Sequence, residues 1–261
     1  MDRRSFIKTT ILGNLALSTT AFKTGKTHIL TLSFDDGFKK SFYRIADIYE
    51  EFGLHACLNV IASGHLPSFQ AVGQYILPEL MGNFDDWNRL QERGHEVMPH
   101  SWQHLNLVQQ PFEKATALIT RCLEYFEANL EGYRSSDAVF NFPFNASTPE
   151  LEAFALTKVR AVRTSGKTAL NPIPDSSVPV ILGCQSKGPE NIDHWVEQQV
   201  NEFLASSGGW LILNTHGLDE EGWGPMSATY LYDLLKRITK LKKLEILPAG
   251  EVLKRTTISK K

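Results

Sequence analysis

Residues 28–37 read HILTLSFDDG, an apolar run rich in β-forming residues that stops at two adjacent carboxylates and a glycine. This pattern predicts a buried β-strand over residues 28–34. Asp35 and Asp36 then lie just past the carboxyl end of that strand, where α/β barrels and open α/β sheets place their chemistry. Taken alone, Asp35-Asp36-Gly37 also fits an ordinary turn.

Histidines follow two further apolar runs. Residues 96–99 lead into His100 and His104, and residues 210–214 lead toward His216. A spacing of four residues places His100 and His104 on one face of a helical turn. Two imidazoles and a carboxylate make a ligand set that suits zinc or another first-row divalent metal. The alternative for the pair is ordinary hydrogen-bonding histidines, but Asp, His and His at three strand ends favour a metal-dependent hydrolase.

The three motifs together resemble those of the polysaccharide deacetylases of the NodB-homology type, carbohydrate esterase family 4. Residues 33–37 match the family's Thr-Phe-Asp-Asp-Gly motif, residues 100–104 its His-Ser/Thr-x-x-His motif, and residues 211–216 its last, apolar strand-end motif. The resemblance extends over residues 28–250. It implies an α/β fold, a single-domain distorted (β/α) barrel with mostly parallel strands and outer helices, and a catalytic domain over residues 28–255.

The resemblance also assigns a role to each motif residue. Asp36, His100 and His104 would hold a divalent metal, with zinc as the first expectation and other first-row divalent metals as alternatives. Asp35 would be the general base and His216 the general acid. The expected substrate is an acetylated glycan that loses N- or O-linked acetyl groups.

The third motif departs from the family pattern. The family has Arg-x-Pro-aromatic-Gly, whereas residues 141–145 read NFPFN, with Asn141 in place of the arginine that orients the base. Phe144 still offers its backbone N–H to the developing oxyanion, because that role needs no side chain.

Arg163 is our candidate substitute for the missing arginine. It lies near the end of a predicted strand over residues 158–164. The hypothesis requires its guanidinium within hydrogen-bond reach of Asp35, roughly 2.7–3.2 Å between heavy atoms; the alternative is an ordinary surface arginine. For the aspartate that orients the acid histidine in the family, the candidates are Asp175 and Asp193.

Two loops on the predicted active face, residues 64–82 and 217–226, are expected to shape substrate access. Trp223 lies in the second loop and Trp102 lies inside the histidine motif. Either indole could stack on a sugar ring, and the alternative is that each packs under a loop.

The rest of the chain alternates between predicted strands and helices, which favours a mostly parallel, barrel-like sheet with outer helices. Helices are predicted over 39–52, 84–92 with Asn83 as its cap, 112–130, 191–206, 227–240 and 249–254. Further strands are predicted over 55–61, 138–142, 178–182 and 244–247.

Composition limits the class of protein. With 261 residues and 42% hydrophobic content the chain can bury the core of one enzyme domain. A net charge of −2 without a basic block in the fold argues against nucleic acid as a partner. No run reaches the ~18–20 apolar residues that span a bilayer. Cys57, Cys122 and Cys184 fit no metal-ligand pattern and are expected as buried free thiols.

Residues 1–22 resemble a twin-arginine export signal. Arg3 and Arg4 open the segment, and a modestly apolar stretch follows over residues 9–22. The expected location is therefore outside the cytoplasm, either periplasmic or extracellular. The alternative is an amphipathic N-terminal helix.

These observations together predict an exported, metal-dependent carbohydrate deacetylase. One alternative is a related barrel hydrolase that acts on non-peptide amide C–N bonds of non-sugar substrates. The other, motivated by Asn141, is a glycan-binding relative with weakened or lost catalysis. The oligomeric state is not predicted.

Overall fold

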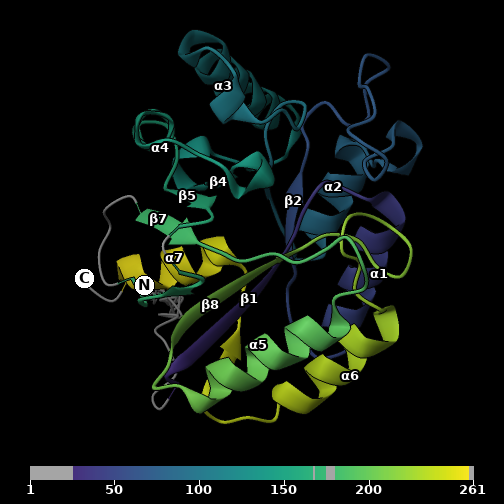
Figure 1. The fold of residues 1–261 in the computed structure, drawn as a ribbon, viewed down its shortest axis with the longest axis vertical. Coiled ribbons are helices and arrows are strands. Elements are labelled where there is room, and N and C mark those ends of the chain that lie inside the picture. Colours follow the sequence, from purple (N-terminus) through teal and green to yellow (C-terminus); the bar gives the residue numbers. More distant parts are fainter. Residues whose placement is uncertain (1–25, 167, 175–179, 259–261) are drawn as a thin grey trace, which may run out of the picture.

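A distorted barrel of mainly parallel strands forms the centre of the molecule (Figure 1). The structure is a computed structural model that describes residues 26–166, 168–174 and 180–258. The strands are β1 His28–Phe34, β2 Cys57–Val60, β3 Glu96–Pro99, β4 Val139–Asn141, β5 Ala161–Thr164, β6 Leu170–Asn171, β7 Val180–Gly183, β8 Gly209–Thr215 and β9 Leu244–Ile246. The larger sheet has the order β3-β2-β1-β8-β6, with β9 beside the amino end of β1, and the smaller sheet has the order β4-β5-β7.

Two narrow seams join the sheets into the barrel. At one seam, Gln185 just past β7 forms a parallel bridge with Leu213 of β8. At the other, the Asn141 side chain of β4 donates to the Pro99 carbonyl of β3 at 3.2 Å. Apart from β6 with β8, the strand pairs that the structure describes are parallel, so their carboxyl ends gather at one end of the barrel. The predicted single-domain α/β fold is confirmed.

Helices cover the outside of this barrel (Figure 1). They are α1 Lys39–Glu50, α2 Phe84–Glu92, α3 Phe112–Asn129, α4 Pro149–Leu156, α5 Asp193–Ala205, α6 Ala228–Ile238 and α7 Ala249–Ile258. Six of them are the predicted helices, with small differences at their ends. The helix α4 was not predicted; it is capped by Thr148, whose hydroxyl accepts a hydrogen bond from the Leu151 N–H at 3.3 Å.

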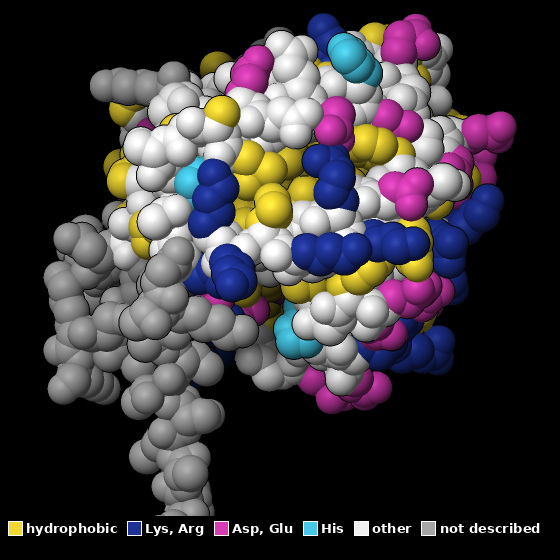
Figure 2. Space-filling view, turned by 90° about the horizontal axis from the view of Figure 1, so that it is seen from below, with side chains coloured by type: hydrophobic (Ala, Val, Ile, Leu, Met, Phe, Trp, Pro, Cys, Tyr) yellow, Lys and Arg dark blue, Asp and Glu magenta, His cyan; other side chains and the backbone are white. Residues whose placement is uncertain are grey.

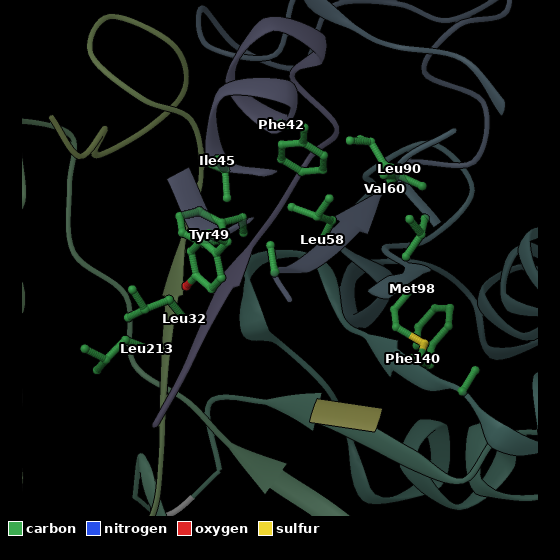
Figure 3. Close-up of a cluster of buried hydrophobic side chains, with 14 of the residues drawn as sticks. Leu32, Phe42, Ile45, Tyr49, Leu58, Val60, Leu90, Met98, Phe140 and Leu213 are labelled. Carbon is green, nitrogen blue, oxygen red and sulfur yellow. The ribbon is translucent and has the colours of Figure 1, made fainter. Parts of the chain in front are cut away.

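The helix α1 shows how the predicted apolar stripe builds the core. Phe42, Ile45 and Tyr49 lie on its buried face and point toward Leu32 of β1 and Leu58 of β2 (Figure 3). Each fully buried side chain of this size stabilises the fold by roughly 1.5–3 kcal/mol. Burial of this face holds α1 directly behind the strand end that carries the two aspartates.

The predicted cap of α2 is also confirmed. The Asn83 side chain accepts from the Asp86 N–H at 3.1 Å, and the Asp86 carboxylate accepts from the Asn83 N–H at 3.1 Å. This reciprocal pair satisfies two backbone donors that would otherwise be orphaned at the start of a helix.

Lysine and arginine side chains border an apolar hollow on the face seen from below, where α5 and α6 lie (Figures 1 and 2).

Three further expectations concern membrane spans, cysteines and the export signal. None of the described helices is both long enough and apolar enough to cross a membrane. The three cysteines are buried and free, as expected. The predicted export signal over residues 1–22 lies outside the described residues.

Candidate active site

The motif residues meet in one cavity of about 470 Å³ at the carboxyl ends of the strands. Strand register causes this convergence, because Phe34 pairs with Thr215 and Val60 pairs with Pro99, so the strands end at the same level. The predicted site residues on the cavity wall are Asp35, Asp36, His100, His104, Phe144, His216 and Trp223. The 64–82 loop contributes Val72, Gly73, Tyr75 and Ile76, which agrees with its expected place beside the site.

Unusual backbone conformations cluster around this cavity. Six non-glycine residues within the described ranges have a positive φ. Five of these six lie in the motif segments around the cavity: Asp36, Ser101, His104, Phe144 and Asn145. A left-handed conformation costs free energy at such residues and persists only where surrounding contacts enforce it. Gly37, with φ of 98°, continues the sharp turn after Asp36, and an added Cβ there would press on Trp87 at 3.3 Å.

A loop, and not the expected helical turn, brings the rings of His100 and His104 together. Residues 100–104 form a loop and not a helical turn. Ser101 and His104 both have positive φ, and the Ser101 hydroxyl accepts from the His104 N–H at 3.0 Å. The Ala62 N–H also donates to the Ser101 carbonyl at 3.0 Å, which fixes the loop to the end of β2. The prediction of a helical turn was therefore wrong, although the two rings do lie together, with centroids 4.9 Å apart.

Asp36, His100 and His104 form a cluster that could hold a metal ion. Their candidate ligand atoms all lie within 4.8 Å of one another. The Asp36 Oδ1 lies 3.5 Å from the His100 Nε2 and 3.4 Å from the His104 Nε2, and no described residue forms a hydrogen bond with this buried oxygen. A buried carboxylate oxygen without a donor is costly unless a cation compensates it. The residues present therefore fit a divalent metal.

The imidazoles are prepared for ligation. The His100 Nδ1 lies 3.0 Å from the Asn141 carbonyl, so it carries the proton and leaves the Nε2 lone pair free. Burial lowers the pKa of His104 to about 4, although the Asp36 carboxylate opposes that shift. His104 is consequently neutral near pH 7, the form that binds metals.

Arg163 makes the contact that the sequence hypothesis required. Its two terminal nitrogens donate to the two carboxylate oxygens of Asp35 at 2.8 and 2.6 Å. Arg163 is only 2% exposed, so the alternative of a surface arginine is wrong. Burial opposes ionisation of Asp35, but the charge of Arg163 and its hydrogen bonds outweigh burial and lower the pKa of Asp35.

Asn59 was missed in the sequence and completes the surroundings of Asp35. Its Nδ2 donates to Asp35 Oδ1 at 2.8 Å and to the Ser33 hydroxyl at 2.8 Å. Its own Oδ1 accepts from the Asn141 side chain at 2.9 Å. The signal was a single amide in the middle of an otherwise apolar buried strand, which needs a polar partner inside the barrel.

No carboxylate among the described residues orients His216 in the cavity. Its ring meets the Trp223 ring edge to face at 5.6 Å, and its buried Nδ1 has no hydrogen-bond partner within the same described ranges. The Asp193 carboxylate accepts instead from the N–H and hydroxyl of Ser227, at 2.8 and 2.5 Å. Asp193 therefore does not orient His216, and Asp175 lies outside the described residues. Burial lowers the pKa of His216, against the effect of the nearby carboxylates.

The aromatic candidates have different surroundings. Trp102 is 5% exposed, is not on the cavity wall, and packs under the Arg121 guanidinium at 3.9 Å and beside Tyr125. The prediction that Trp102 is available to a sugar is therefore wrong, because the 100–104 loop turns its indole inward. Phe144 is 56% exposed and covers the His104 ring at 4.7 Å. Trp223 is half-buried on the cavity wall.

Asn145, which lines the cavity, was also missed in the sequence. It occupies the glycine position of the third motif and has φ of 50°, a conformation that asparagine tolerates better than most residues. Its Nδ2 donates to Asn214 Oδ1 at 3.0 Å, whereas its buried Oδ1 has no partner among the residues that the structure describes.

Comparisons with known proteins show the family of this chain and structures that share its fold. A family model described as polysaccharide deacetylase matches residues 22–157, which is more than half of the chain. A structure provisionally described as a polysaccharide deacetylase from Mycobacterium smegmatis superposes with a TM-score of 0.71 at 12% identity, covering 93% of this chain and 94% of that one.

Two further solved structures share the fold. A peptidoglycan deacetylase from Bacillus subtilis has a TM-score of 0.54 at 17% identity, covering 88% of this chain and 91% of that one. The carbohydrate esterase domain of a multidomain xylanase from the hindgut metagenome of Trinervitermes trinervoides has a TM-score of 0.54 at 14% identity, with coverage of 88% and 91%. No curated protein matches the chain.

Proposed function

The chain belongs to the polysaccharide deacetylase family, a family of hydrolases, and from this premise we propose that it removes N- or O-linked acetyl groups from a glycan with the help of a divalent metal. The observation that carries the proposal is the convergence of Asp36, His100 and His104 beside the Asp35–Arg163 ion pair. We propose these three residues as the metal ligands, with zinc as the first candidate. When bound, the ion would act as a Lewis acid on the acetyl carbonyl and lower the pKa of water.

Asp35 is our proposed general base. Its lowered pKa keeps the carboxylate ionised near neutral pH, and the bidentate contact with Arg163 fixes its orientation. It is thus able to accept a proton from the attacking water. The Phe144 N–H would stabilise negative charge on the acetyl oxygen, because it lies on the loop that bounds the cavity.

His216 is our proposed general acid, which protonates the departing amine or alcohol. Burial lowers its pKa. The imidazolium is therefore a stronger proton donor than an ordinary one, although a smaller fraction is protonated at neutral pH. Trp223 contacts the imidazole edge to face, so in our proposal it both positions His216 and offers an apolar surface to the sugar.

Acetate release is the direct test of this proposal. Purified protein, stripped and reloaded with zinc or another divalent metal, is assayed on acetylated chitin oligomers, acetylated xylan and peptidoglycan. We expect the variant His100→Ala/His104→Ala to lose both metal and activity. Asp35→Asn and His216→Ala should keep the metal and lose on the order of 10²-fold or more in turnover.

Each alternative has its own signature in the same assay. Stoichiometric metal in the double histidine variant would contradict the ligand assignment. Glycan binding without acetate release would identify a binding protein, and hydrolysis of cyclic amides in place of acetylated sugars would identify a hydrolase of non-sugar amides.

We also propose that the protein is exported through the twin-arginine route. The support is the Arg3-Arg4 pair followed by a modestly apolar stretch. Changing Arg3 and Arg4 together to lysine keeps the charge but removes the pair that this route reads. We expect the variant to accumulate in the cytoplasm in cell fractionation, and export at the wild-type level would contradict the assignment.

A further inference from the structure

A second cavity adjoins the one that holds the catalytic motifs. Its volume is about 520 Å³, and the two cavities share Phe144, Asn145 and Ser186 as a common wall. Beyond that wall the second cavity is lined by hydroxyl and amide side chains, including Thr168 and Gln185, and by the half-buried indole of Trp195 on α5. Hydrogen-bonding groups together with an aromatic side chain are the combination that holds a sugar ring.

The orientation of the Asn145 amide follows from its neighbour. The Asn214 Nδ2 faces two backbone carbonyls, those of Thr215 at 3.1 Å and Ser33 at 3.4 Å, so its Oδ1 is an acceptor. Asn145 must therefore present its Nδ2 to that oxygen, which it does at 3.0 Å. Within the part of the chain that the structure describes, no donor reaches its buried Oδ1, and the residue is only 8% exposed and borders both cavities.

We propose that Asn145 is a substrate-binding residue and that the second cavity holds the sugar unit next to the one that loses its acetyl group. The Asn145 Oδ1 accepts a hydrogen bond from an N–H or O–H of the sugar unit in the second cavity, and Trp195 contacts the ring of that sugar. Such a contact satisfies an acceptor that is otherwise desolvated without compensation. The substrate is then an oligosaccharide or polymer of at least two units and not a free monosaccharide. This inference rests on the proposed deacetylase function.

The variant Asn145→Gly provides the cleanest test. Glycine adopts φ of 50° without strain and is the family's residue at this position, so the loop is preserved while the acceptor is removed. Binding of the N-acetylglucosamine tetrasaccharide and of the monosaccharide is measured by calorimetry on zinc-loaded protein. We expect the tetrasaccharide to bind about tenfold more weakly than to the wild type, with a clearly smaller loss of affinity for the monosaccharide and unchanged metal content.

Trp195, which lines only the second of the two cavities, gives a second, independent variant. Trp195→Ala should weaken tetrasaccharide binding to a similar degree, whereas Trp195→Phe, which keeps an aromatic face, should restore most of it. The matched control is Val108→Ala, which shortens an exposed apolar side chain lining a different hollow. It should bind both sugars as the wild type does.

The outcomes separate this inference from the proposed function. Unchanged tetrasaccharide affinity in Asn145→Gly and Trp195→Ala, or equal losses for both sugars, would overturn the second sugar site. Wild-type protein that binds the tetrasaccharide through these residues but releases no acetate would support the site and contradict deacetylation.

Discussion

Asp35 is held by an arginine that the family pattern places on a different strand. Asn141 occupies the motif position on β4, and Arg163 is its register partner on the neighbouring strand β5. One step across a parallel sheet moves the backbone by about 4.8 Å, a distance that the long arginine side chain can span. The guanidinium therefore reaches the same carboxylate, and Asn141 fills the vacated position by holding Asn59.

Replacing Arg163 with methionine tests this compensation. Methionine fills similar space but has neither the positive charge nor the hydrogen-bond donors that offset the burial of Asp35. The pKa of Asp35 should therefore rise, and its carboxylate should no longer be held in one orientation. We expect turnover to fall on the order of 10²-fold, with unchanged metal content. The acid limb of the kcat/KM profile should move to higher pH, because the base then stays protonated to higher pH.

Arg163→Lys serves as the conservative comparison, since it retains charge without the bidentate geometry, and should recover part of the activity. Circular dichroism establishes that each variant is folded, which matters because an unpaired buried charge destabilises a fold by about 3–5 kcal/mol. A folded Arg163→Met enzyme with wild-type turnover would exclude a role for this arginine in positioning the base.

For single residues, the sequence was informative where a functional side chain comes directly after a predicted strand. Asp35, His100 and His216 could be placed because each follows a recognisable apolar run. Asn145 could not, because its significance depends on an unpaired oxygen in the folded loop. Trp102 was misjudged for a related reason, since the positive φ of Ser101 and His104 sets the direction of the side chains between them.

At the scale of strands and helices, β3 and β4 are joined by hydrogen bonds of a polar side chain in place of a ladder of backbone hydrogen bonds. The Asn141 amide donates to Asn59 Oδ1 at 2.9 Å and to the carbonyls of Pro99 and Val139 at 3.2 and 3.1 Å. Its backbone carbonyl faces the His100 Nδ1. One residue thereby connects the seam of the barrel to the candidate metal ligand.

Asn141→Leu should separate these two tasks. Leucine is similar in size but leaves the Asn59 and Pro99 oxygens without that donor, so we expect a loss of about 1–3 kcal/mol in the free energy of unfolding. Metal content should persist, because the backbone carbonyl opposite His100 remains. Urea denaturation measures the change, and Asn201→Leu on the exposed side of α5 is the control, expected within about 0.5 kcal/mol of the wild type. Equal stability of the two variants would show that the seam does not depend on this amide.

Strands and helices were predicted correctly where the pattern of apolar residues was clear. The strand β1 is apolar throughout, and the apolar positions of α1 fall on one face. The helix α4 was missed because only Leu151 and Ala155 of its eight residues are buried, so no long apolar stripe marks it. The strand β6 has two residues, too few to show any alternation.

At the scale of the whole molecule, the class of fold could be predicted but the closure of the barrel could not. Alternating strands and helices indicated parallel pairing. The seams, however, depend on a few isolated contacts: the bridge at Gln185, the Asn171 side chain of β6 bonded to the Gly183 backbone of β7, and the Asn141 side chain. Such contacts leave no periodic trace in a sequence.

The candidate metal site links the ends of β1 and β3 within the larger sheet, with β2 between them. Asp36 lies 64 residues from His100 in the chain, so the three ligands come together only in the folded protein. A metal that binds the folded state and not the unfolded chain stabilises it by about 2.7 kcal/mol at a free concentration of 100 times Kd. For a chain of this size that corresponds to a rise in Tm of about 5–10 °C.

Thermal unfolding of chelator-treated protein with and without added zinc measures this rise. The variant His216→Ala should show it in full, because His216 shares the cavity but not the ligand set. The variant His100→Ala/His104→Ala should show none. A zinc-dependent rise that survives in the double variant would place the ion elsewhere in the protein, and a rise absent from the wild type would argue against a resident metal. The measurement needs no substrate, so it tests the ligand assignment independently of catalysis.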